Sequence, residues 1–405
     1  MGVNQGDATT PGALWPSVQY EERDWTVNHP GTLSGTQRRE LVGPYQAAIT
    51  PDIALATVSL PSSVQADAEE ATAEIVRFDT EVGHHIAPFT ALLLRSESAA
   101  SSKIENLTAS ARAIALAELG IAKGTNAPLV VANTRAMEAA IGLAGSLDAA
   151  AIITMQATLL DETAPTMTGR FRDQQVWIGG SDYGPHTAMF VPPHHSRVPD
   201  AIEDLVAFMG RTDIPALAHI AVAHAQFETI HPFLDGNGRI GRALVHVILR
   251  SRGVTRAVTV PVSAGLLTNT PAYFDALTAY RTGDIEPIMV ALTDATFASL
   301  ANGRTLIGEL QDIREAWNDS VHARSDSVAW RIADLLVRQP AIDWPTLQRE
   351  LDPTSPAAYR AIERLLAAGV LIEITGGARH QAWVAPQVLA ALDGFATRAG
   401  RRGRV

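Results

Sequence analysis

The sequence contains no cysteine, which excludes disulfide bonds, thiolate metal sites and a cysteine nucleophile. A chain without disulfides suits a reducing compartment, so we expect a cytoplasmic protein. Lysine is nearly absent too: of 32 basic residues, all but Lys103 and Lys123 are arginines. With 43 acidic residues the net charge is −11, which argues against a surface that binds phosphate backbones throughout.

A long hydrophobic run is also missing. The longest uncharged apolar stretch that we expect to be helical runs from Ile214 to Phe227, and it carries His219 and His224. A membrane-spanning helix needs about 20 apolar residues, so we expect no membrane partner. From Met1 to Pro30 the chain is polar and rich in glycine and proline, unlike a signal peptide.

The 405 residues suggest two or three domains, and 46% hydrophobic with 19% charged residues is typical of a globular protein. We expect an irregular N-terminal arm at 1–45, an N-terminal helical region at 46–125, a helical core at 126–320 and a separate module at 325–405. Helical periodicity is expected at 62–119, 126–145, 147–160, 199–209, 215–230, 238–250, 271–280 and 284–315. The fold class is therefore all-α.

Two short strand-like runs interrupt the helical pattern at 175–178 and 188–191. They flank the turn residues Gly179 and Gly180, so they predict a β-hairpin with a long loop. From the sequence alone, this hairpin is either a structural element or part of a site.

The C-terminal module has its own pattern. Helices are expected at 327–338, 344–351 and 355–368, followed by a small hairpin at 371–374 and 381–384. Three helices and a two-stranded wing resemble a winged-helix domain. The third helix offers Tyr359, Arg360 and Arg364, but the module is only slightly basic, so both DNA and protein contacts suit it.

One dodecapeptide carries most of the chemistry: His231-Pro232-Phe233-Leu234-Asp235-Gly236-Asn237-Gly238-Arg239-Ile240-Gly241-Arg242. Proline ends the preceding helix, and the Gly-Asn-Gly turn points successive N–H groups into one concavity. A helix begins directly after the turn, so its positive end faces the same place.

The charged residues of this peptide fit a phosphoryl centre. Arg239 and Arg242 are three residues apart and share a helix face. Asp235 supplies one carboxylate for a divalent metal already bound to phosphates, and His231 is a base for pH near neutrality. The alternative is a glycine-rich helix connection with surface arginines, which these four side chains at these spacings disfavour.

The dodecapeptide resembles the Fic family signature, His-x-Phe-x-Asp/Glu-Gly-Asn-Gly-Arg-x-x-Arg, at every defined position. The resemblance implies a Fic/Fido helical core and the transfer of AMP from ATP to a Ser, Thr or Tyr hydroxyl of a protein. It implies that His231 deprotonates the hydroxyl and that Asp235 holds Mg²⁺. Phe233 would anchor the loop in the core.

The same resemblance implies how the nucleotide is held. The phosphate cradle would be formed by Gly236, Asn237 and Gly238, with Arg239 beside it and Arg242 reaching the γ-phosphate. The segment 266–273 resembles the place where relatives carry nucleotide contacts, which implies adenosine contacts for Asn269 and Tyr273.

A second string, from Ser101 to Asn106, resembles the inhibitory motif of the family, Ser/Thr-x-x-x-Glu-Gly/Asn. It implies that Glu105 pairs with Arg242 and keeps it from the γ-phosphate. The motif precedes the core, as in the class with an N-terminal inhibitory helix. The competing interpretation is a helix capping box formed by Ser102 and Glu105.

The resemblance further implies that the hairpin at 175–191 is the flap on which a hydroxyl-bearing target protein docks as an added strand, and it suggests a homodimer. We expect an autoinhibited protein adenylyltransferase. The alternatives are a Fic enzyme that moves UMP, phosphate or phosphocholine or removes AMP, a DNA-binding regulator that senses nucleotide, and an inert scaffold.

Overall fold

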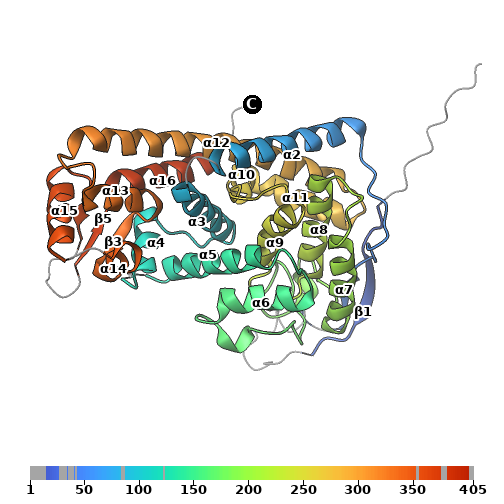
Figure 1. Ribbon diagram of the computed structural model, residues 1–405. Coiled ribbons are helices and arrows are strands. Elements are labelled where there is room, and N and C mark those ends of the chain that lie inside the picture. The colour runs from blue at the N-terminus through green and yellow to red at the C-terminus, as the bar shows by residue number, and fades with distance from the viewer. Residues whose placement is uncertain are drawn as a thin grey trace, which may run out of the picture.

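The computed structural model describes residues 15–26, 34, 41, 43–83, 87–121, 124–352, 355–374 and 381–400. Most of these residues are helical, and two small sheets complete the fold (Figure 1). The predominantly helical architecture expected from the sequence is confirmed. Within the described part of the chain, none of the helices combines the length and the apolar character that a membrane span requires.

The first sheet corrects one expectation. Strands β1 (Gln19–Arg23) and β2 (Tyr45–Ile49) pair antiparallel, with Gln19 opposite Ile49, whereas the sequence analysis expected no regular structure before residue 45. The sequence of β1 is polar and largely exposed, so its own pattern does not mark a strand. Pairing with the more buried β2 creates it.

The expected hairpin at 175–191 is reduced to one bridge. Ile178 pairs with Phe190, and the intervening loop contains a 3₁₀ turn, η3 (Pro185–Thr187). Pro192 and Pro193 follow at once, and proline has no N–H with which to extend the ladder. The backbone N–H of Ala48 in β2 donates to the carbonyl of Val191 at 3.0 Å, so the first sheet braces this segment.

Among the described residues between 62 and 320, eleven helices form the helical body. They are α2 (Ser62–Gly83), α3 (Ala87–Ile104), α4 (Ala111–Glu118), α5 (Asn126–Gly142), α6 (Ala149–Leu160), α7 (Val198–Met209), α8 (Ala216–Ile230), α9 (Asn237–Ser251), α10 (Val262–Leu266), α11 (Thr270–Arg281) and α12 (Glu286–Ser320). Short 3₁₀ turns are η2 (Pro165–Met167), η4 (His195–Arg197) and η5 (Leu267–Asn269). The single stretch expected at 62–119 is thus three helices.

Helix α8 forms the centre of this body. Every residue from Leu217 to Ile230 is buried, because the helix is apolar on nearly all sides and packs against α2, α7, α9, α11 and α12. Helix α3 lies nearby and contacts α5, α9 and α10. Figure 1 shows α12 running along one side of the molecule toward the C-terminal elements.

The C-terminal elements are α13 (Val328–Arg338), β3 (Ala341–Asp343), α14 (Trp344–Leu351), α15 (Ser355–Ala367), β4 (Ile372–Glu373), β5 (Ala382–Val384) and α16 (Pro386–Ala399). The strands form one sheet in the order β3-β5-β4, so β3 adds a third strand to the expected hairpin. Tyr359, Arg360 and Arg364 are exposed on α15. The winged-helix assignment stays a prediction. Helix α16 returns to pack on α3, α4 and α12.

Candidate active site

The dodecapeptide begins where α8 ends. Its first residue, His231, has φ 51° and ψ 60°, a left-handed conformation that is uncommon outside glycine. The N–H of His231 donates to the carbonyl of Phe227 at 2.9 Å, and Pro232 prevents the helix from continuing. The chain therefore turns sharply at the imidazole.

A buried arginine from outside the dodecapeptide holds this turn. Arg172 is 3% exposed, and its Nε donates to the carbonyl of His231 at 2.8 Å. Its Nη2 donates to the carbonyl of Pro193 at 2.5 Å and its Nη1 to that of Gln174 at 3.1 Å. The guanidinium thus joins the His231 turn to both ends of the 175–191 segment. The sequence analysis missed Arg172, which nothing distinguishes among so many arginines.

The loop after His231 is closed by an amide and an aromatic ring. The Oδ1 of Asn237 accepts from the N–H of Phe233 at 2.8 Å, and its Nδ2 donates to the Phe233 carbonyl at 2.9 Å. Phe233 is fully buried against Phe171 and Phe227. The side chain of Asn237 therefore braces the loop, and its backbone is left to face the concavity.

The imidazole of His231 is oriented by a carbonyl. Its Nδ1 lies 3.3 Å from the carbonyl oxygen of Glu228, which can only accept, so this contact places the proton on Nδ1 and the lone pair on Nε2. Burial, reinforced by the positive charge of Arg172, lowers the pKa of His231 to about 4. The ring is therefore neutral near pH 7 and can take a proton at Nε2.

One turn earlier on α8, Glu228 is a second buried titratable group that the sequence analysis missed. It is 6% exposed, and its Oε1 has no hydrogen-bond partner among the described residues. Burial raises the pKa of this carboxyl to about 7, although the positive charge of Arg242 opposes the shift. A carboxyl group in an otherwise apolar helix was the available signal.

At the other end of the loop, the exposed Asp235 pairs with the buried Arg239. The side chain of Asp235 is 54% exposed, accepts from the N–H of Gly236 at 2.6 Å and lies 3.3 Å from Nη2 of Arg239. The Nε of Arg239 is buried without a hydrogen-bond partner in the described chain. An unpaired buried guanidinium N–H beside a helix N-terminus suits an anionic ligand.

These residues fit a magnesium ion only together with phosphates. No group of three or more histidine, aspartate or glutamate side chains among the described residues is arranged to hold a metal ion. Mg²⁺ is commonly bound through one or two carboxylates, several waters and the phosphates of a substrate. The half-exposed carboxylate of Asp235 suits the first of these roles.

Arg242, one turn into α9, is held by the end of α3. Its Nη2 lies 2.9 Å from Oε1 of Glu105 and donates to the carbonyl of Ser101 at 2.9 Å, while its Nε donates to Oγ of Ser101 at 2.9 Å. Desolvation lowers the pKa of Arg242, but Glu105, Tyr273 and Glu228 together outweigh it and the net pKa is raised. Desolvation likewise raises the pKa of Glu105, and the positive charges of Arg242 and Arg239 contribute to a net lowering.

The carboxylate of Glu105 also lies over the glycine turn. A Cβ placed on Gly238 would collide with Oε1 of Glu105 and would crowd Nη1 of Arg242 at 2.9 Å. Gly236, with φ 87°, supplies the left-handed turn that precedes α9. An anion from this chain therefore sits where the glycines and the N-terminus of α9 meet.

Of the two residues expected to contact adenosine, Tyr273 lies beside Arg242 of this cluster. Tyr273 is buried, and its hydroxyl lies 2.9 Å from Nε2 of His224. Asn269 caps α11 by accepting from the N–H of Ala272 at 3.4 Å. Both line a cavity of about 500 Å³ beside α10 and α12, and their role in nucleotide binding stays a prediction.

Comparison with known proteins identifies the segment around this cluster. Residues 146–249 match the Fic/DOC family. The protein adenylyltransferase fic-1 of Caenorhabditis elegans is 27% identical over 152 residues, which cover 37% of this chain and 27% of that protein. The protein adenylyltransferase Fic of Drosophila willistoni is 28% identical over 152 residues, covering 37% and 28%. The chain thus spans about a quarter of the length of these curated relatives.

Two solved structures of Fic proteins align with this chain with TM-scores below 0.5. A Fic family protein from Desulfovibrio desulfuricans G20 has a TM-score of 0.49 and 20% identity, covering 83% of this chain and 98% of that one. A fragment of Fic-1 from C. elegans has a TM-score of 0.46 and 20% identity, covering 62% and 74%.

Proposed function

We propose that this Fic/DOC domain protein is a protein adenylyltransferase that transfers AMP from ATP to a hydroxyl side chain and is held inactive by Glu105. One observation carries the proposal: the glycine turn and Arg242 already grip an anion, the Glu105 carboxylate, beside a neutral imidazole. A site that binds one carboxylate through a helix N-terminus and a guanidinium is built for phosphates too.

The chemistry follows from where the side chains lie. The hydroxyl oxygen of the target attacks the α-phosphorus of ATP and gives its proton to Nε2 of His231. The bond from the α-phosphorus to the bridging oxygen breaks, and pyrophosphate leaves. The N–H groups of the glycine turn, with Arg239, hold the charge on the phosphates. Asp235 would hold Mg²⁺, which would neutralise phosphate charge.

Glu105 inhibits because it competes for the same groups. Two anions cannot share the Arg242 guanidinium and the face of Gly238, so the carboxylate keeps the terminal phosphate of ATP out of its productive position. The contact is reversible, since the Glu105 side chain is 42% exposed and is held by a single ion pair.

The target protein docks on the 175–191 segment. In the single bridge, Ile178 pairs with Phe190, and Met189, next to it, is 86% exposed. An extended target segment can add along such an incompletely paired backbone. Because Arg172 ties both ends of this segment to the His231 turn, a docked hydroxyl is carried close to the base.

Labelled ATP tests the proposal. We expect the Glu105→Gly variant to incorporate label from the α-phosphate of ATP into itself or a protein in cell lysate, at least tenfold faster than the unchanged protein. Label on the γ-phosphate should not be incorporated. The matched control is Glu105→Gly combined with His231→Ala, in which Arg242 is equally free but the base is missing.

Two results would contradict the proposal. Incorporation of γ-label would indicate phosphate transfer, and equal α-labelling with and without His231 would remove the imidazole as the base. A lysate labelled better with α-labelled UTP than with ATP would identify a different donor.

A further inference from the structure

A second cavity lies behind α3, away from the candidate active site. Glu97, Ser101 and Glu105 recur every four residues and face α9, where they contact His246 and Arg242. Ser96 and Lys103 are on another side of the same helix and line the cavity. One helix therefore separates the inhibitory contact from this second space.

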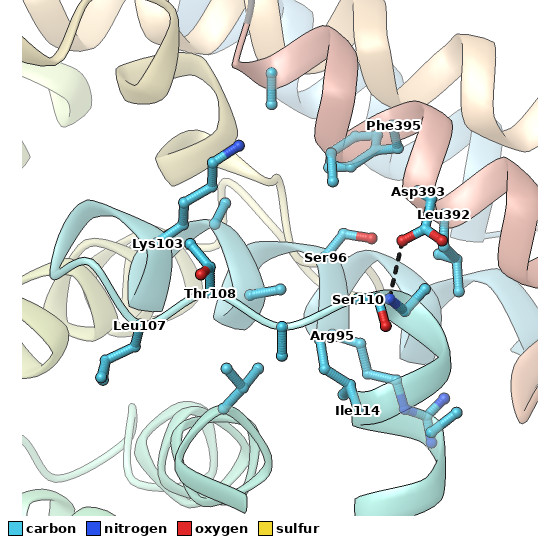
Figure 2. Close-up of a pocket in the computed structure, with 18 of the residues that line it drawn as sticks. Arg95, Ser96, Lys103, Leu107, Thr108, Ser110, Ile114, Leu392, Asp393 and Phe395 are labelled. Carbon is cyan, nitrogen blue, oxygen red and sulfur yellow. Dashed lines mark hydrogen bonds between the residues drawn. The ribbon is translucent and has the colours of Figure 1, made fainter. Parts of the chain in front are cut away.

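The cavity is enclosed by parts of the chain that are distant in sequence. Its walls are α3, the connection into α4, α4 itself and α16, as Figure 2 shows. It has a volume of about 390 Å³, within the range of small-molecule sites. Apolar side chains form most of the lining: Ala99, Ala100, Leu107, Ile114, Leu392 and Phe395.

Three of its charged groups, Arg95, Glu118 and Asp393, already have partners. Arg95 pairs with Glu118, with 2.5 Å between Nε and Oε1, and also donates to the carbonyl of Arg338. Asp393 accepts from the N–H of Ala111 at 2.9 Å, at the start of α4 (Figure 2). These contacts hold the walls together, and of the engaged carboxylate atoms only Oε2 of Glu118 is left buried without a hydrogen-bond partner among the described residues.

Lys103 is different. It is half-buried, and no hydrogen bond or ion pair joins its ammonium to another residue in the described part of the chain. The hydroxyls of Ser96 and Thr108 are likewise without a hydrogen bond to described residues. The cavity thus offers one available cation and two hydroxyls on a mainly apolar wall.

We propose that this cavity is a binding site for a small amphipathic anion, with an apolar body against the alanine and phenylalanine walls and an anionic head on Lys103. The apolar lining supplies affinity through buried surface, and the single cation selects the sign of the head group. Oε1 of Glu118 and Oδ1 of Asp393 are occupied, but Oε2 of Glu118 is buried without a hydrogen-bond partner among the described residues, so a cationic probe is the decisive test of the sign of the head group.

Ligand binding should also affect the position of α3. This inference rests on the adenylyltransferase function proposed above. The cavity has this shape while Glu105 is on Arg242, so a ligand that fits it favours the inhibited arrangement. Lys103 is only two residues from Glu105. Occupancy should therefore hold the inhibitory segment in place and slow adenylylation.

Calorimetric titration of the full-length chain tests the site, with octanoate as the probe and octylamine and octanol as probes of matched length. We expect octanoate to bind one site per chain, octanol about tenfold more weakly and octylamine not at all. Lys103→Gln should weaken octanoate binding about tenfold and leave octanol binding unchanged.

Matched variants distinguish binding in this cavity from nonspecific binding elsewhere on the protein. Ala99→Leu fills the cavity and should abolish binding of both probes, whereas Ala91→Leu, on the same helix outside the lining, should not. Arg112→Gln removes a charge from exposed surface of α4 and should leave octanoate binding unchanged. Thermal unfolding checks that each variant is folded.

The outcomes are distinct. Failure of octanoate to bind, or equal binding of octanoate and octylamine, overturns the site regardless of any activity. Octanoate should also slow α-labelling by the unchanged protein at least threefold and leave Glu105→Gly unaffected; equal slowing of both, or none, overturns the link to α3. Absence of labelling in every variant would instead contradict the proposed adenylyltransferase activity.

Discussion

The loop that begins at His231 and the end of α3 that carries Glu105 meet at Arg242 but are held in different ways. The His231 turn is fastened by Arg172, by the amide of Asn237 and by the fully buried ring of Phe233. The inhibitory segment ends at Glu105, whose side chain is 42% exposed, and Asn106 follows in a left-handed conformation. The first region is buried throughout its contacts, whereas in the second Ser101, Ser102 and Ile104 are buried and only the end at Glu105 and Asn106 is exposed.

This difference implies that the site is assembled before inhibition is relieved. Removing the Glu105 side chain should leave the turn, the glycines and His231 in place, because the hydrogen bonds from Arg172 and Asn237 that hold the loop do not involve α3. Activation then needs only a local displacement at the end of a helix. Such local openings cost far less than unfolding the body of a domain.

The largest effect is expected from the base itself. In the Glu105→Gly background, His231→Ala should lower α-labelling by a factor of about 10²–10⁴, the range for loss of a general base. With a pKa of about 4, His231 stays neutral down to about pH 5, so activity should fall only as the pH approaches 4. A labelling time course at several pH values measures both. A midpoint of the activity profile near pH 6.5 would mean that burial does not lower the pKa of His231.

Substitution of Arg172 tests how much its hydrogen bonds stabilise the His231 turn. Arg172→Gln leaves several buried carbonyls without donors, and we expect the free energy of unfolding to fall by about 3 kcal/mol. Loss of the buried positive charge should also raise the pKa of His231, which NMR titration measures. Arg172→Lys keeps the charge and is the control for the electrostatic part. An unchanged His231 pKa in Arg172→Gln would argue against the coupling.

Glu228 gives a pH-dependent test of the same core. Its folded pKa of about 7 is above the unfolded value of 4.5, so the folded state binds the extra proton and loses stability as the pH rises from about 4.5 through 7. Glu228→Gln should therefore stabilise the protein by roughly 1–3 kcal/mol at pH 8 and have little effect at pH 4. Chemical denaturation at both pH values measures this, and equal effects at both would contradict the shift.

The smallest effect is expected from the Ser101 hydroxyl, which contributes less to holding Arg242 than the Glu105 ion pair does. Ser101→Ala removes the hydroxyl that accepts from Nε of Arg242 but leaves the Glu105 ion pair, so labelling should rise only about threefold. Ser102→Ala is the matched control, because the Ser102 hydroxyl accepts from Asn133 instead. A larger rise for Ser102 than for Ser101 would mean that helix stability, not the arginine contact, sets the inhibition.

The sequence by itself determined what is local. Twelve consecutive residues specify a helix end, a left-handed turn and a new helix, because proline and glycine fix backbone angles without help from distant residues. The apolar stretch from Ile214 to Phe227 likewise predicted a helix, and α8 lies there. The resemblance of two short strings suggested the pairing of Glu105 with Arg242, which the structure brings within 2.9 Å.

Only the tertiary structure decided what depends on distant partners. Arg172 reaches the His231 turn across 59 residues, and β1 is a strand only because β2 pairs with it. The regular hairpin expected at 175–191 was wrong, since prolines and a braced backbone end its ladder after one bridge. The cavity behind α3 exists because α16 folds back from the C-terminal end, and no local pattern in the chain encodes that return.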